Sequence, residues 1–391
     1  MTFPFPPGPR GTVPPRYARL LADEPVSEVT LADGTTIRLV TRYEDVRTVL
    51  SSERFSRYRA AVLPGTGLGR SQGTGLVDLD PPAHTRLRDP VAAAFAPGRT
   101  ARLRPRIEAV ADGILDALPA GDGPVDLVGG YTAPFAGRVV CELLGLPGEQ
   151  WRQFTGGAET LLTPGLPEAR ARAARLRLRD ALLELLTARR ETPGDDVASV
   201  LLSDGGQLTD DERVLLLHGL IVSGFIGVRD LLARHLFALL AEPALLARLV
   251  REPAAIPAAV GELLRYYPSS NDGLLRVATE DVVLSGTLVP AGAPVLPLVS
   301  AASRDPGVFD RPDVLDIDRP PGPGHGLAFG AGRHACPAAD LAVTELSVGV
   351  GRLLAAFPAL RLAVAADEVE HSSALLPLGI PALPVVPGPR R

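Results

Sequence analysis

The stretch Phe329-Gly330-Ala331-Gly332-Arg333-His334-Ala335-Cys336-Pro337-Ala338 carries most of the information about how this chain folds. Its two glycines allow a tight turn and let a flat ligand approach the backbone closely. Pro337 suits the first position of a helix, so the sequence predicts that Cys336 lies at the N-terminus of a final helix spanning 337–357. At that position the helix dipole and free backbone N–H groups stabilise a thiolate, the form of cysteine that binds metals.

The simpler interpretation of this stretch is a buried cysteine in a glycine-rich turn, which a lone cysteine would favour. The whole string argues against it, because an arginine and a histidine place positive charge beside the turn. The other cysteine, Cys141, lies in an apolar helical pattern and is interpreted as a buried structural thiol. Two cysteines in a chain of this length exclude a disulfide scaffold.

The stretch resembles the cysteine loop of the bacterial cytochrome P450 family, Phe-Gly-x-Gly-x-His-x-Cys-x-Gly, and the resemblance extends over essentially the whole chain. The matching residues are Phe329, Gly330, Gly332, His334 and Cys336, and Ala338 stands where the family has its last glycine. The resemblance implies haem b as cofactor, with Cys336 as the thiolate ligand of its iron. It also implies a mostly α fold with minor β, in which a long central helix lies over the haem.

Composition and patterning are those of a globular protein, with 46% hydrophobic and 22% charged residues. A net charge of −5 does not fit nucleic-acid binding. The proline-rich segment 1–16 is unlike a signal peptide, and no stretch reaches the roughly 18 uninterrupted apolar residues of a membrane span. We therefore expect a cytoplasmic protein that binds neither nucleic acid nor membrane. Without a linker or an internal repeat, residues 1–391 are predicted to form a single domain.

The pattern of apolar residues predicts mainly helices. Residues 26–40 alternate around Asp33-Gly34, which is typical of a hairpin. Residues 54–75 are rich in glycine and predict a functional loop. Residues 277–297 indicate short strands, and 303–335 are irregular. Acids after Thr209 predict the start of a long helix that runs to Ala241, before Pro243. The other predicted helices are 43–50, 85–96, 100–118, 131–144, 149–162, 167–190, 195–202 and 257–267.

Glu262-Leu263-Leu264-Arg265 matches the Glu-x-x-Arg motif of the family, and its two charged residues share one helix face. By itself this spacing would fit a surface ion pair of little value. The resemblance makes Arg319 a third partner. It implies that Glu262, Arg265 and Arg319 form a buried charge network that fixes the loop beneath the haem.

The haem propionates require cations, and the resemblance places candidates in three segments. His84 and Arg88 lie four residues apart in a predicted helix, Arg276 begins a predicted strand, and His334 lies in the cysteine loop. Each could also be an ordinary surface base. Together with the cysteine loop, we expect His84, Arg88, Arg276 and His334 to contact the cofactor.

Glycines inside the long predicted helix are unusual, because each costs about 1 kcal/mol relative to alanine. Leu220, Ser223, Gly224 and Gly227 fall on one face. Such a small-residue stripe suits helix packing, but it also suits the face of a flat cofactor. The resemblance favours the second interpretation and makes these residues candidates for the substrate pocket.

The family pattern Ala-Gly-x-Glu/Asp-Thr falls on Ser223-Gly224-Phe225-Ile226-Gly227. The acid has become Ile226 and the alcohol Gly227. In the family this pair relays protons during oxygen activation, and neither replacement carries a group that can do so. Phe225 is expected to form an aromatic wall over the iron face. We therefore regard Phe225, Ile226 and Gly227 as an atypical oxygen-side catalytic segment.

Three explanations of the missing pair stay open. A hydroxyl of the substrate and an ordered water could relay protons. The reaction could need less proton relay, as in oxidative coupling, desaturation or rearrangement. Oxygen activation could also be lost, leaving a non-catalytic haem-binding or recruiting protein.

The leading hypothesis is a haem-thiolate monooxygenase acting on a small, mainly apolar secondary metabolite. Further pocket candidates are Leu274, Leu275 and Leu375. The chain has no attached reductase domain, so we expect ferredoxin and ferredoxin reductase to supply the electrons.

Overall fold

A computed structural model describes residues 3–31, 33–63, 75–162, 167–268, 270, 273–320, 325–372 and 378–391 of the chain; the side chains of 157–162 and 168 are not described. Helices form most of it, and three small sheets complete it. The α-helices are α1 Arg16–Asp23, α2 Tyr43–Ser51, α3 Arg57–Ala61, α4 Ala83–Ala94, α5 Pro97–Leu115, α6 Ala133–Leu144, α7 Trp151–Leu162, α8 Glu168–Glu191, α9 Val197–Leu202, α10 Asp210–Leu240, α11 Pro243–Arg251, α12 Ile256–Tyr266, α13 Val299–Ala302 and α14 Ala339–Ala356.

The main sheet has five strands in the order β1-β2-β8-β5-β3. The hairpin of β1 and β2 is antiparallel as predicted, with Gly34 at a φ of 87° in its turn. β2 pairs with β8 in parallel, so segments distant in the sequence meet there. The strands are β1 Val26–Thr30, β2 Thr36–Val40, β3 Phe55–Ser56, β4 Val125–Asp126, β5 Arg276–Ala278, β6 Val282–Leu284, β7 Thr287–Val289, β8 Pro294–Pro297, β9 Arg361–Leu362 and β10 Pro384–Val386.

Helix α10 begins and ends where the sequence predicts. The Thr209 hydroxyl accepts a hydrogen bond from the Glu212 N–H while Glu212 bonds back to the Thr209 N–H, which forms a capping box. Pro243 then opens α11. Among the described residues, α10 is the one helix long and apolar enough to cross a membrane, and half of that apolar stretch is buried inside the protein.

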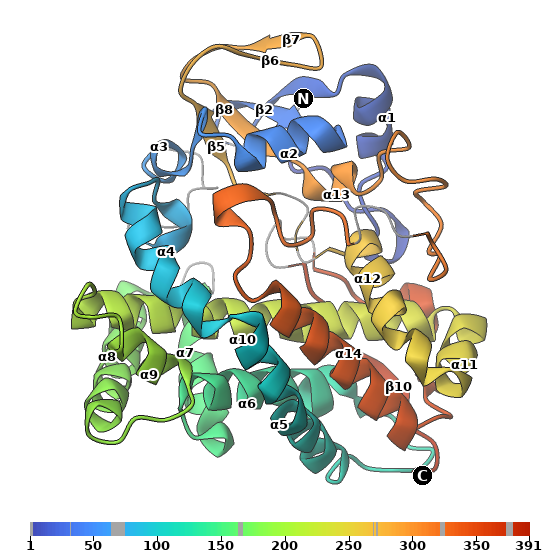
Figure 1. The fold of residues 1–391 in the computed structure, drawn as a ribbon. Helices are drawn as coiled ribbons and strands as arrows, with labels where there is room; N and C mark the ends of the chain where they lie inside the picture. The colour runs from blue at the N-terminus through green and yellow to red at the C-terminus, as the bar shows by residue number, and fades with distance from the viewer. Residues whose placement is uncertain are drawn as a thin grey trace.

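Figure 1 shows the main sheet with α1 and α2 at one end of the molecule and the larger helices at the other. α10 crosses the helical part and packs against α6, α7, α8 and α14. Its apolar residues join those of α5, α6, α12 and α14 in the largest hydrophobic cluster. The segment that leads into α14 lies between the two parts, and its short turn η6, Gly332–His334, contacts α2.

Some elements differ from the predictions. α1, α11 and the sheet β4-β10-β9 were not predicted. The predicted loop 54–75 contains β3 and α3, and its residues 64–74 lie outside the described part. The final helix begins at Ala339 rather than at Pro337, because a turn occupies residues 337 and 338. Cys336 therefore precedes the helix and is not part of its first turn.

Candidate active site

Cys336 is held at the end of a tight loop. Gly330 and Gly332 have φ values of 75° and 70°, a backbone conformation that glycine adopts without strain. The Cys336 N–H donates to the carbonyl oxygen of Phe329 at 2.9 Å, and the Ala335 N–H donates to that of Gly332 at 3.0 Å. Both bonds close the loop on the N-terminal side of the cysteine.

Cys336 is an exposed residue, but desolvation of its thiol by the surrounding protein raises the pKa of that thiol. The Ala338 N–H and the Arg88 guanidinium act in the opposite direction, because both favour the thiolate. A metal ion would complete the deprotonation.

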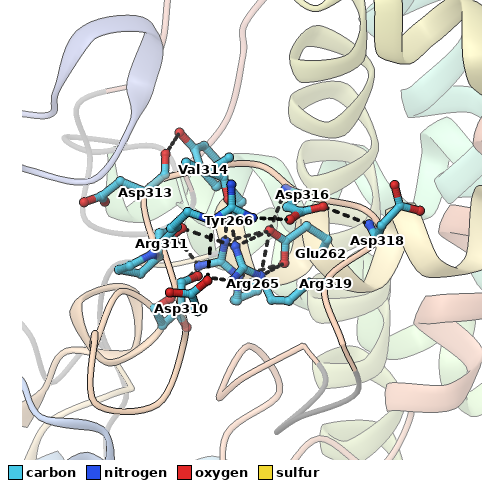
Figure 2. A network of polar contacts seen from close by, with 12 residues as sticks. Glu262, Arg265, Tyr266, Asp310, Arg311, Asp313, Val314, Asp316, Asp318 and Arg319 are labelled. Carbon is cyan, nitrogen blue, oxygen red and sulfur yellow. Dashed lines mark hydrogen bonds and ion pairs between the residues drawn. The ribbon is translucent and has the colours of Figure 1, made fainter.

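Figure 2 shows the charge network built on α12. Arg265 is fully buried, and its Nε and Nη2 donate to both oxygens of Glu262 at 2.8 and 2.7 Å. Arg319 reaches the same carboxylate at 3.2 Å. The backbone N–H of Asp316 donates to Glu262 Oε1 at 3.0 Å. The structure thus brings together the three residues that the sequence indicated.

This network holds the backbone that precedes the cysteine loop. Nη1 of Arg265 donates to the carbonyl oxygens of Ser303 and Pro312 at 2.7 and 2.8 Å. Burial acts to raise the pKa of Glu262, but the hydrogen bonds from Arg265, Asp316 and Arg319 outweigh it and leave the pKa below its usual value. Glu262 is therefore ionised at neutral pH, and its charge is fully partnered.

The predicted cofactor-binding bases meet beside the cysteine loop. The rings of His84 and His334 lie 4.3 Å apart. Nη2 of Arg88 donates to the carbonyl oxygen of Ala335 at 2.7 Å. Arg276 is buried at the start of β5 and acts electrostatically on His334. Helix α4, strand β5 and the cysteine loop thus contribute to one cationic cluster.

The charge of this cluster fits an anionic group. Desolvation, together with the nearby bases Arg276, His84, Arg57 and Arg333, lowers the pKa of His334 to about 2. The Nε2 atom of His334 is buried and bonds to none of the described residues. A cavity of about 320 Å³ adjoins the cluster and is lined in part by Asp80, Arg276 and His334. Carboxylate groups of a bound cofactor would be attracted to Arg88 and Arg276 in this cluster.

Sequence reasoning missed Arg57, another cation near His334. Its guanidinium is buried, forms an ion pair with Asp78 at 3.0 Å and donates to the carbonyl oxygens of Val77 and Leu275. It therefore connects α3 to the segment after residues 64–74 and to the chain before β5. No motif marks this residue, because its partners become neighbours only in the folded protein.

One face of α10 is open near its middle. Ser223 is exposed, Leu220 and Gly227 are partly exposed, and a Cβ added to Gly227 would meet no atom within 4 Å. These positions suit the substrate-pocket role that the sequence indicated. Gly224 instead turns toward α6, where an added Cβ would lie 2.9 Å from Val140.

The structure corrects the expectation for Phe225. This side chain is 1% exposed and packs against Trp151 of α7, with ring centroids 5.8 Å apart, so it does not form a wall over an open space. Ile226 is buried as well.

The remaining pocket candidates differ in position. Leu275 is 1% exposed, so its side chain is almost fully enclosed by protein. Leu274 is partly exposed and has a φ of 66°. Leu375 lies outside the described residues.

Comparisons with known proteins agree with this geometry. The family model for cytochrome P450 matches residues 255–373. Nocardicin C N-oxygenase of Nocardia uniformis subsp. tsuyamanensis is 40% identical over 91% of this chain and 90% of that protein. Mycinamicin IV hydroxylase/epoxidase of Micromonospora griseorubida is 37% identical over 96% of each. The structure of the LnmA hydroxylase of the leinamycin pathway, from Streptomyces atroolivaceus, superposes with a TM-score of 0.90 at 38% identity, covering 98% of this chain and 99% of that one.

The fold and site define a haem-thiolate oxidoreductase of the monooxygenase type. The chain belongs to the cytochrome P450 family. The family's cofactor is a haem whose iron is bound by a cysteine thiolate, and when bound it supplies the activation of dioxygen. Its relatives include oxygenases and hydroxylases of bacterial natural-product biosynthesis.

Proposed function

We propose that this protein oxidises a small, mainly apolar natural product that binds between the open face of α10 and the haem. In this assignment Cys336 binds the iron, and His84, Arg88, Arg276 and His334 hold the propionates. Phe329 and Gly330 shape the loop beneath the macrocycle. The observation that carries the substrate assignment is the open space at Gly227, where a side chain would otherwise occupy the middle of the α10 face.

The proton supply differs from the usual arrangement of the family. Neither Ile226 nor Gly227 has a titratable or hydroxyl group, and Ile226 is buried away from the open face. A polar group of the substrate, together with an ordered water, then delivers the proton. The absence of a side chain at Gly227 leaves the room that such a water requires.

A second candidate is a reaction without oxygen insertion, such as oxidative coupling, desaturation or rearrangement. The absence of an acid and an alcohol at Ile226 and Gly227 favours this second candidate, because a pocket without these groups suits chemistry with a smaller need for proton relay. A non-catalytic haem protein is the third candidate. Ferredoxin and ferredoxin reductase would serve the first two as electron donors in the cytoplasm.

The first experiment tests the haem-thiolate assignment. The reduced protein with carbon monoxide should show the strongly red-shifted Soret band of thiolate ligation, and Cys336→Ala should abolish it while Cys141→Ala retains it. A band that survives in Cys336→Ala would show that another residue binds the iron.

The second experiment tests the reaction class. Purified protein is incubated with ferredoxin, ferredoxin reductase, NADPH and candidate natural products under ¹⁸O₂, and the products are analysed by mass spectrometry. A product that contains ¹⁸O supports oxygenation. An oxidised product without the label supports coupling or desaturation. If ligands bind but none is converted, the non-catalytic candidate is favoured.

A further inference from the structure

Apart from Asp211 in the first turn, the exposed residues of helix α10 lie near its middle. Between Arg213 and Leu240, Gly219 and Ser223 are the exposed residues, one helical turn apart. Gly227 follows after another turn, and neither glycine has an atom within 4 Å of the place where its Cβ would be. The open face therefore presents Ser223 between two positions without side chains.

Ser223 is the one serine in the 31 residues of α10, which contains no threonine or tyrosine. Its hydroxyl donates to the carbonyl oxygen of Gly219 at 2.6 Å. A serine hydroxyl has one donor and two acceptor sites. Because the proton is already engaged by the helix, the hydroxyl can offer only lone pairs to the open space.

The surroundings make this acceptor distinctive. Its neighbours on the open face are Gly219, Leu220 and Gly227, none of which has a polar side chain. The hydrogen bond to Gly219 contributes little to the helix, since a serine that bonds to the carbonyl four residues before it slightly destabilises and bends helices. A hydroxyl in an apolar site separates ligands that carry a matching polar group from those that lack it.

We propose that Ser223 is a specificity-determining residue whose hydroxyl oxygen accepts a hydrogen bond from an O–H or N–H group of the substrate. This inference rests on the proposed function, because it requires the substrate to lie on the open face of α10. The donor group of the substrate then lies beside Ser223, one helical turn from Gly227. The absence of the family's alcohol side chain at Gly227 leaves space there. The favoured substrates are therefore apolar molecules with one hydroxyl or amine at this position.

The test uses ligands of defined geometry, since the substrate is not identified. The ortho, meta and para isomers of 4-(hydroxyphenyl)imidazole are compared with the matching 4-(methylphenyl)imidazoles. The imidazole nitrogen binds the iron, so the substituted ring samples the α10 face in three directions. Dissociation constants are measured from the shift of the haem absorption band in the haem-loaded wild type.

In the wild type, at least one hydroxyl isomer should bind about fivefold more tightly than its methyl counterpart, as one net hydrogen bond would give. Ser223→Ala should remove this preference, and Ser223→Thr, which keeps the hydroxyl, should retain it. Ser347→Ala is the matched control, because Ser347 makes the same type of bond within α14, to the Val343 carbonyl at 2.7 Å. Its preference should equal that of the wild type.

The proposal is overturned if the wild type shows no hydroxyl preference, or if Ser223→Ala shows the same preference as the wild type. Both outcomes are separate from failure of the proposed function. Binding of the azoles to the iron tests the haem site, and the labelled-oxygen experiment tests the reaction, whatever Ser223 does.

Discussion

Gly332 lies directly against Ser51, so closely that a Cβ on Gly332 would be 2.5 Å from the Cα of Ser51. The contact joins the cysteine loop to the last residue of α2. Because the obstacle is backbone rather than a flexible side chain, it cannot move aside without shifting α2. The position of the haem ligand is therefore tied to a helix near the start of the chain.

Alanine substitution of the two loop glycines should separate strain from crowding. In Gly330→Ala the new Cβ would meet no atom closer than 3.8 Å. The substitution should therefore cost only the strain of holding alanine in the left-handed conformation, about 1–2 kcal/mol. Gly332→Ala adds the collision with Ser51 and should lose more stability and most of its haem. Thermal unfolding and haem content measure both effects. Equal losses in the two variants would mean that the contact with Ser51 is unimportant.

Glu262→Ala should destabilise the protein by about 3–5 kcal/mol, because it leaves the buried guanidinium of Arg265 without its carboxylate. The exposed pair Arg248–Asp318 provides the control, and Asp318→Ala should cost at most about 1 kcal/mol. Denaturant unfolding of both variants gives the comparison. Similar losses of stability in the two variants would mean that the α12 network stabilises the protein no more than an ordinary surface ion pair does.

The stabilising effect of Glu262 should also depend on pH. Its pKa in the folded protein is lower than in the unfolded chain, so the stabilisation is present above the unfolded value of about 4.5 and is lost as the pH falls through the folded value. The difference in melting temperature between wild type and Glu262→Gln should be constant near neutral pH and shrink in acid below about 4.5. A difference that grows on acidification would contradict this sign.

Gly227→Thr tests what the open face of α10 is for. If the wild type suffers only from weak proton relay, the new hydroxyl should raise the fraction of reducing equivalents that form product rather than peroxide. If the native reaction needs the open space, the side chain should crowd the pocket and lower native turnover. NADPH consumption, peroxide and product are measured together. High coupling in the wild type, with ordinary hydroxylation of a substrate that has no polar group near the iron, would contradict both interpretations.

Local signals in the sequence predict the elements that local interactions determine. Asp33-Gly34 predicts the hairpin, and Thr209 with Glu212 predicts the start of α10. The pairing of β2 with β8 could not be predicted, because its partners are far apart in the sequence. Periodicity places Phe225 on a helix but does not show that Trp151 covers it.

The candidate site, like the fold, was predicted where short local motifs mark it. The cysteine loop and the Glu262–Arg265 pair follow from short motifs, since their spacing reflects one turn and one helix face. Pro337 suggested a helix start that the structure places two residues later. Arg57 carries no motif, so only the folded arrangement reveals its contacts.

The parallel pairing of β2 with β8 has a consequence for the order of assembly. During synthesis, residues 36–40 leave the ribosome long before residues 294–297 exist, so the central part of the main sheet cannot close until most of the chain has been made. Non-local pairing of this kind slows folding and leaves strand edges exposed in the meantime. The N-terminal hairpin must therefore wait for its partner. The cysteine loop, which contacts α2, is synthesised later still, so the expected haem ligand Cys336 becomes available only after both central strands have been made.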